Sequence, residues 1–166
     1  MRQNKMDIEQ KLNKEISMLF KPSSGQKQAG TVKNSLTYSE FLADKMLIIS
    51  MIKMGVPYSL FNLIKDVTPF SEGDWAAVLG ISTKSLLRHK QASKQFKPIQ
   101  SEKIIEMAEV TNVGTEVFGD MEKFKLWLNT PSIALGNMKP IELIRDSYGK
   151  EMVIDELIRI EHGIFV

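Results

Sequence analysis

Cysteine is absent from this sequence of 166 residues, and histidine occurs only twice, at His89 and His162. The lack of cysteine excludes a disulfide scaffold, catalysis by a thiolate, and zinc or iron–sulfur sites built on cysteine. Two histidines are too few for a metal centre made of histidine ligands. The sequence therefore predicts neither a metal site nor a bound cofactor.

Long apolar runs are also missing. The longest apolar stretch, residues 46–52, lies between Lys45 and Lys53 and is far shorter than the roughly 20 residues that a membrane span needs. The chain is polar and charged through Lys14, so we expect no signal peptide. With 43% apolar and 25% charged residues, the composition is that of one or two soluble domains. We expect a cytoplasmic protein that does not contact a membrane.

Motifs that carry catalysis are lacking as well. The sequence has no glycine-rich phosphate loop and no Gly-x-Ser-x-Gly element. The adjacent carboxylates Asp155 and Glu156 would point about 100° apart on a helix, so they could not act on one substrate bond. We therefore expect that the protein is not an enzyme.

Apolar residues recur with helical spacing along most of the chain, and no useful run alternates as a strand would, which predicts an all-α fold. Residues 1–20 carry such a stripe, at Ile8, Leu12 and Ile16. A stretch rich in Gly, Ser, Gln and Lys follows as far as Ser35 and indicates a flexible linker. The amphipathic helix that precedes this linker either folds back onto the domain or binds a partner protein.

Capping residues and helix breakers divide the rest of the chain. Thr37 and Glu40 have the capping-box spacing, and Pro98 opens a long helix. The predicted helices cover residues 37–53, 57–67, 71–80, 82–91, 98–118, 120–128, 139–145 and 147–162. The buried arc of the last helix is predicted to be Val153, Ile154, Leu157, Ile158 and Ile160.

Residues 72–91 have the spacing of a helix-turn-helix. Ala76 is small where the second helix would cross, Gly80 can turn the chain with a positive φ, and Ile81 and Leu86 can pin the second helix to the first. The outward positions of that second helix, with the loop after it, are short polar or cationic. The predicted DNA-binding residues are Ser82, Thr83, Lys84, Ser85, Arg88, His89, Lys90 and Lys94.

Charge supports this prediction. No acidic residue lies between Asp74 and Glu102, whereas that window holds five lysines and arginines. A surface that binds phosphates should carry no carboxylates. The alternatives are a helix corner that never meets DNA and an ordinary local fluctuation of charge.

The last third of the chain combines several ordered motifs: Glu116-Val117-Phe118-Gly119-Asp120, Phe124-x-x-Trp127-Leu128, Thr130-Pro131, Ala134-Leu135-Gly136, Pro140-Ile141-Glu142-Leu143, Tyr148-Gly149 and Arg159-Ile160-Glu161-His162-Gly163-Ile164-Phe165. Together with the helix-turn-helix, this order resembles the antitoxins of the Xre/MbcA/ParS type from about Trp75 to Val166. Residues 137–140, Asn-Met-Lys-Pro, depart from the family pattern, and residues 1–35 have no fixed counterpart in it.

The chain is expected to have three parts. Its composition and spacing indicate an N-terminal helix and linker over residues 1–35. The resemblance implies an Xre-like helix-turn-helix domain over 36–97 and a small helical domain for toxin binding and dimerisation over 98–166. It further implies an antitoxin that binds a RES-domain toxin attacking NAD⁺, forms a homodimer and represses its own operon at operator DNA. A dimeric helix-turn-helix regulator without a toxin partner is the alternative function.

The residues of the last helix and tail agree with a second partner surface. Tyr148 and Met152 lie outside the predicted buried arc, and Gly149 indicates a close approach by another backbone. The chain ends on three apolar residues, which dock either on their own domain or on a partner. The predicted toxin-binding residues are Tyr148, Gly149, Lys150, Met152, Arg159, His162, Gly163, Ile164, Phe165 and Val166.

Overall fold

The computed structural model describes residues 2–21, 36–92 and 94–164, and this part of the chain is helical without any β-strand. The all-α prediction is therefore confirmed for the described residues. The helices are α1 (Arg2–Leu19), α2 (Tyr38–Ala43), α3 (Lys45–Met54), α4 (Tyr58–Asp66), α5 (Glu72–Val78), α6 (Thr83–Ala92), α7 (Pro98–Phe118), α8 (Met121–Leu128), the 3-10 helix η1 (Ile133–Leu135), α9 (Pro140–Leu143) and α10 (Ser147–Glu161).

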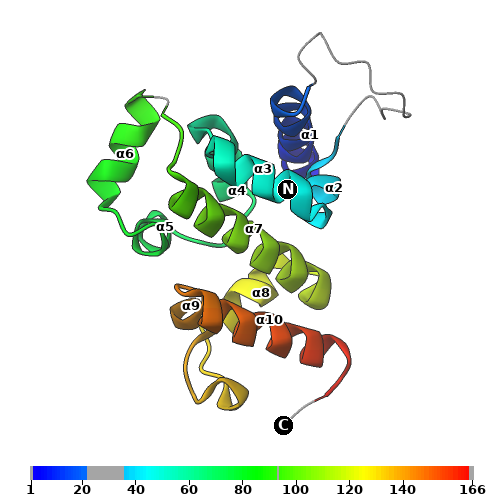
Figure 1. The fold of residues 1–166 in the computed structure, drawn as a ribbon. Coiled ribbons are helices and arrows are strands. Elements are labelled where there is room, and N and C mark those ends of the chain that lie inside the picture. The colour runs from blue at the N-terminus through cyan, green and yellow to red at the C-terminus, as the bar shows by residue number, and fades with distance from the viewer. Residues whose placement is uncertain (1, 22–35, 93, 165–166) are drawn as a thin grey trace.

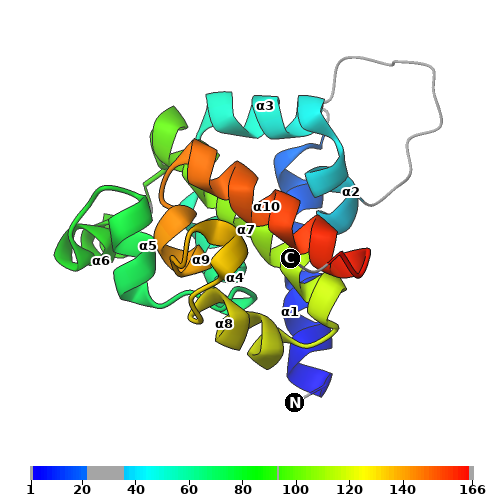
Figure 2. The same cartoon turned by 90° about the horizontal axis from the view of Figure 1, so that it is seen from below.

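The long helix α7 runs through the middle of the molecule (Figure 1). It packs against α3 on the N-terminal side and against α8 and α10 on the C-terminal side. Its buried residues include Ile104, Met107 and Val110, so this helix is covered on more than one face. Helix α10 lies across α7, while α6 projects from one side of the molecule (Figure 2).

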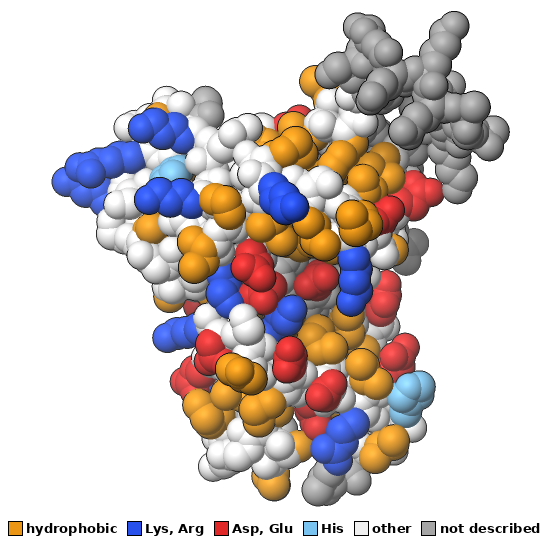
Figure 3. All heavy atoms as spheres, in the orientation of Figure 1, with side chains coloured by type: hydrophobic (Ala, Val, Ile, Leu, Met, Phe, Trp, Pro, Cys, Tyr) orange, Lys and Arg blue, Asp and Glu red, His pale blue; other side chains and the backbone are white. Residues whose placement is uncertain are grey.

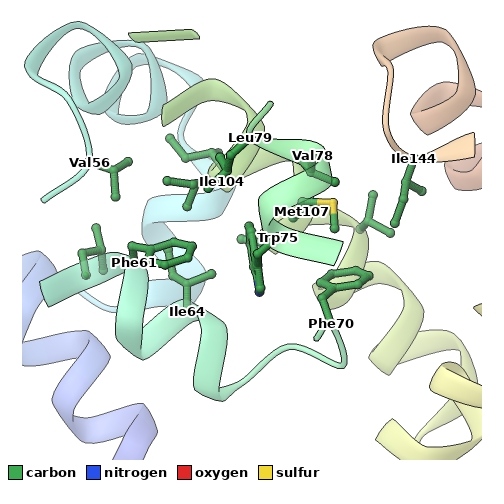
Figure 4. Close-up of a cluster of buried hydrophobic side chains, with 14 of the residues drawn as sticks. Val56, Phe61, Ile64, Phe70, Trp75, Val78, Leu79, Ile104, Met107 and Ile144 are labelled. Carbon is green, nitrogen blue, oxygen red and sulfur yellow. The ribbon is translucent and has the colours of Figure 1, made fainter. Parts of the chain in front are cut away.

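One apolar core includes buried residues from Leu12 on α1 to Leu157 on α10. Figure 4 shows a part of it. Trp75 on α5 meets Phe61 on α4 edge to face, with ring centroids 5.1 Å apart, and Phe70 packs on its other side at 5.8 Å. Met107 of α7 and Ile144, which follows α9, belong to the same cluster. The N-terminal helices and the C-terminal helices are thus parts of one packed body.

The structure settles the place of α1, which folds back onto the helices that follow the linker. Its apolar stripe is buried at Leu12 and Ile16. The backbone N–H of Tyr38 donates to Oδ1 of Asn13 (2.7 Å), and the Ser17 hydroxyl donates to the Leu36 carbonyl (2.9 Å). The predicted linker lies outside the described residues except for Lys21.

The helix predicted over residues 37–53 is in fact two helices that meet at Asp44. This residue has extended backbone angles (φ −103°, ψ 101°), and its carboxylate accepts from the N–H groups of Met46 and Leu47 (2.8 and 3.2 Å). The carboxylate caps α3, so the chain turns where apolar spacing alone indicates a continuous helix. The capping box of Thr37 and Glu40 at the start of α2 is confirmed.

The buried arc of α10 is narrower than predicted. Val153 and Leu157 are fully buried, but Ile158 is exposed. Within the described ranges, no helix combines the length and the hydropathy required to cross a membrane.

Candidate functional site

The turn between α5 and α6 has the geometry of a helix-turn-helix. Gly80 adopts φ +62°, and its N–H donates to the Ala77 carbonyl (3.2 Å) while the N–H of Ile81 donates to the Ala76 carbonyl (3.0 Å). These two bonds form a Schellman motif, which ends α5 and sends the chain across to α6. The side chains of Ala76 and Leu86 are buried, as the motif requires.

Helix α6 presents a polar and cationic surface to solvent. The Ser82 hydroxyl accepts from the N–H of Ser85 (3.1 Å), which makes Ser82 the N-cap of α6. In Figure 3, Lys and Arg side chains gather over this helix. Of the predicted DNA-binding residues, those exposed are Ser82, Thr83, Lys84, Arg88, Lys90 and Lys94, while Ser85 is half-buried and bonded to Ser82. Leu87, which the sequence pattern did not single out, is exposed on the same helix.

His89 has a different environment from the other predicted DNA-binding residues. Its ring stacks on Phe96, with centroids 4.7 Å apart and planes 7° apart, and its Nδ1 atom is buried. Phe96 is itself buried, and its N–H donates to the Val56 carbonyl (2.9 Å). The His89 ring therefore packs α6 against the core and does not belong to the exposed candidate surface.

Gly149 owes its lack of a side chain to packing within this chain. A Cβ atom at Gly149 would lie 2.0 Å from the carbonyl oxygen of Leu143. The N–H of Gly149 donates to the N-capping carboxylate of Asp146 (2.8 Å), which fixes the start of α10. The close approach expected here is therefore made by α9, and Gly149 is buried beneath the surface that a partner could reach.

Lys150 is also engaged internally. Its Nζ lies 3.6 Å from Oε1 of Glu106 and 3.5 Å from Oε2 of Glu109, both on α7. Glu106 is buried and also pairs with Lys103 (2.8 Å). Lys150 thus helps to balance the charge of the buried Glu106 carboxylate, and its ion pairs link α10 to α7.

The outward face of α10 is apolar in its first half. Tyr148 is 84% exposed and Met152 is 47% exposed, and their spacing of four residues places them on one side of the helix. Arg159 lies seven residues further on, with its guanidinium 3.5 Å from the Glu156 carboxylate. The outward face of α10 therefore mixes apolar side chains with a partly exposed ion pair.

Helix α10 ends in a second turn with a positive φ angle. Gly163 adopts φ +68°, and the N–H groups of Gly163 and Ile164 donate to the carbonyls of Ile160 and Arg159 (3.0 and 2.9 Å). This second Schellman motif leaves His162 and Ile164 exposed. Phe165 and Val166 lie outside the described residues.

Sequence reasoning missed a second group of exposed apolar residues in the C-terminal half. Ile133 is 83% exposed, and Leu126 and Met138 are also exposed. The loop that carries Ile133 is closed by Ser132 and Met138, whose backbones bond at 3.0 Å. Because these residues sit in a turn and a short helix, no periodic pattern marks them in the sequence.

Comparison with known proteins adds independent findings. Residues 114–163, which run from the end of α7 to the end of α10, match the family described as the antitoxin Xre/MbcA/ParS C-terminal toxin-binding domain. A protein of Yersinia enterocolitica named Antitoxin Xre is 29% identical over 72% of this chain and 81% of its own length. A second Antitoxin Xre, from Photorhabdus laumondii, is 27% identical over 69% of this chain and 78% of its own.

A chain in the crystal structure of the M. tuberculosis MbcT–MbcA toxin–antitoxin complex is 22% identical, with a TM-score of 0.49 over 58% of this chain and 86% of that chain. The family match and the two relatives confirm the resemblance that the sequence motifs carry. The chain is thus similar to antitoxins of the Xre/MbcA/ParS type, and the match to their C-terminal toxin-binding domain covers residues 114–163.

Proposed function

We propose that this protein is the antitoxin of a type II toxin–antitoxin system and neutralises a RES-type toxin that attacks NAD⁺ by binding it directly. The observation that carries the proposal is the apolar outward face of α10, at Tyr148 and Met152, within a region that matches a toxin-binding family. The protein acts in the cytoplasm as a binding protein, without a cofactor or catalysis of its own.

The chemistry of α10 supports binding to a protein. The Tyr148 ring and the Met152 side chain are apolar surfaces left in water, and covering them would contribute roughly 25 cal/mol for each Å² of apolar area removed from water. Arg159 can donate several hydrogen bonds to a carboxylate or a carbonyl at the edge of the same face. The exposed end of α10, with His162 and Ile164, extends this surface toward the tail. We place the occlusion of the toxin's cofactor cleft at this end.

The second part of the proposal is repression of the antitoxin's own operon through α5 and α6. The support is the ordered turn at Gly80 together with the cationic side chains of Lys84 and Arg88, which have no carboxylate near them in sequence. A homodimer would place two such helices on one operator, since dimers bind paired half-sites about one turn of DNA apart.

Co-expression with the toxin encoded by a neighbouring gene tests the toxin-binding proposal. Met152→Glu should weaken toxin capture at least tenfold and abolish rescue of growth, because it places a charge in the proposed interface. Met46→Glu is the matched control, since Met46 on α3 is 69% exposed and lies in the other half of the molecule. This control should capture the toxin as the unchanged protein does.

Two outcomes would contradict the proposal. Equal toxin capture by both variants would remove α10 from the interface. A tight homodimer that captures no toxin at all would favour the alternative function, a helix-turn-helix regulator without a toxin partner.

A further inference from the structure

A basic hollow lies between α1, α4 and the last turn of α6. It has a volume of about 610 Å³, and its walls are formed by α1 and α4 together with Lys90 of α6. Its lining includes Lys11, Lys14, Glu15 and Met18 of α1, Tyr58, Ser59, Asn62 and Leu63 of α4, and Lys90 of α6. The sequence placed Lys90 in the DNA-binding segment, but it gave no role to α1.

The wall made by α1 is held in a fixed position. Leu12 and Ile16 are buried against the domain, and the Ser59 hydroxyl donates to the Glu15 carboxylate across the α1–α4 contact (2.5 Å). Lys14 is therefore carried by an anchored helix. Fixing a helix in advance reduces the conformational entropy that binding would otherwise cost.

The charges of the hollow favour an anion. Lys14 and Lys90 are exposed and have no ionic partner within the described residues. Lys11, which also lines the hollow, is paired with Asp7 (2.6 Å). The one carboxylate of the lining, Glu15, already accepts the Ser59 hydroxyl. The lining thus holds three lysines and one carboxylate, so the hollow carries a net positive charge.

Neutral hydrogen-bond donors lie between these lysines. Partial burial raises the pKa of the Tyr58 hydroxyl above its ordinary value, so this group stays protonated and can donate. Asn62 has its amide 3.4 Å from the Asp66 carboxylate and keeps donor capacity to spare. Hydroxyl and amide donors beside lysines are the groups that contact phosphate and sugar in protein–DNA complexes.

We propose that this hollow binds the sugar–phosphate backbone of the same duplex whose major groove receives α6. Helix α1 then serves as a phosphate-contacting arm of the DNA-binding surface, with Lys14 and Lys90 on either side of one backbone segment. The proposal rests on the DNA-binding part of the proposed function. It adds a site on residues 1–20, which the helix-turn-helix alone does not include.

The experiment measures binding of the full-length chain to a fluorescent duplex from the region upstream of its own gene, and to a duplex of random sequence, between 50 and 200 mM salt. Lys14→Gln should weaken binding to both duplexes by about fivefold and reduce the slope of log K against log salt by about one. Lys14→Glu should weaken binding further. Lys123→Glu, an exposed lysine of α8, is the charge-matched control and should bind as the unchanged protein does.

The outcomes separate this inference from the function on which it rests. If Lys84→Glu with Arg88→Glu abolishes binding while both Lys14 variants bind like the control, the hollow has no role and only this inference fails. If the unchanged protein binds neither duplex, both the repressor function and the hollow are wrong. A loss of toxin capture by Lys14→Glu, with DNA binding intact, would assign the hollow to a protein partner and overturn the proposal. Thermal unfolding confirms that each variant is folded.

Discussion

The exposed faces of α6 and α10 differ in chemistry although both helices pack on the same core. Helix α6 offers Lys84 and Arg88 in a stretch of sequence without acidic residues, whereas α10 offers Tyr148 and Met152. Exposed cations cost nothing in water and attract phosphate over about 10 Å at 0.1 M salt. Exposed apolar groups act only at contact. The difference indicates that added salt should weaken binding at α6 far more than binding at α10.

The two faces also differ in how they are supported. Helix α6 is held by Leu86 and by the stack of His89 on Phe96. Helix α10 is held by a backbone contact at Gly149 and by ion pairs from Lys150 to α7. A substitution can therefore disrupt one face and leave the residues of the other unchanged, and three variants test the comparison.

The largest effect is expected from Gly149→Ala. The added Cβ would lie 2.0 Å from the Leu143 carbonyl oxygen, and a backbone atom cannot move aside cheaply, so we expect a loss of about 3 kcal/mol in the free energy of unfolding. Toxin capture should fall with it. Denaturant unfolding measures the loss, and Gly73→Ala is the control because its Cβ would meet only the Ser71 hydroxyl oxygen at 3.6 Å. Equal stability of the two variants would contradict this packing.

A smaller but selective effect is expected from Lys84→Glu combined with Arg88→Glu. Both side chains are exposed, so folding should be unaffected, while two reversed charges should weaken operator binding by roughly fiftyfold. Toxin capture should stay within twofold of the unchanged protein. An operator-binding titration beside a toxin pull-down measures both. Unchanged DNA affinity would show that the basic face of α6 serves another purpose.

The smallest effect is expected from Lys150→Met, which tests whether this lysine supports α10 or contacts a partner. Because Glu106 keeps Lys103 at 2.8 Å, the cost should be only about 1 kcal/mol in the free energy of unfolding. Toxin affinity should not change measurably. A tenfold loss of affinity with unchanged stability would return Lys150 to the toxin-binding surface.

Local signals in the sequence predicted much of the fold. The capping box at Thr37, the turn at Gly80 and the proline at the start of α7 each act within a few residues, and each is confirmed. The break at Asp44 was missed because the residues on both sides of it are good helix formers. A single carboxylate that caps α3 decides the break, and apolar spacing does not register it.

The candidate site was harder to predict because it depends on contacts between distant residues. The stretch around Gly149 correctly indicated a close approach, but only the structure shows that α9 makes it. His89 has the spacing of an outward residue, yet Phe96 returns from the following loop and covers its ring. Ile133 is exposed because it lies in a turn that is closed by the bridge between Ser132 and Met138. Such a turn leaves no periodic pattern of apolar residues in the sequence.

The position of α7 limits how such a protein can change partners. This helix packs against α3 as well as against α8 and α10. Exchanging the C-terminal helices by recombination would therefore leave the α7 side chains that contact α8 and α10 without matching neighbours. If α10 binds the toxin as proposed, single substitutions at exposed positions such as Tyr148 and Met152 change specificity at a lower cost in packing than replacement of the whole module.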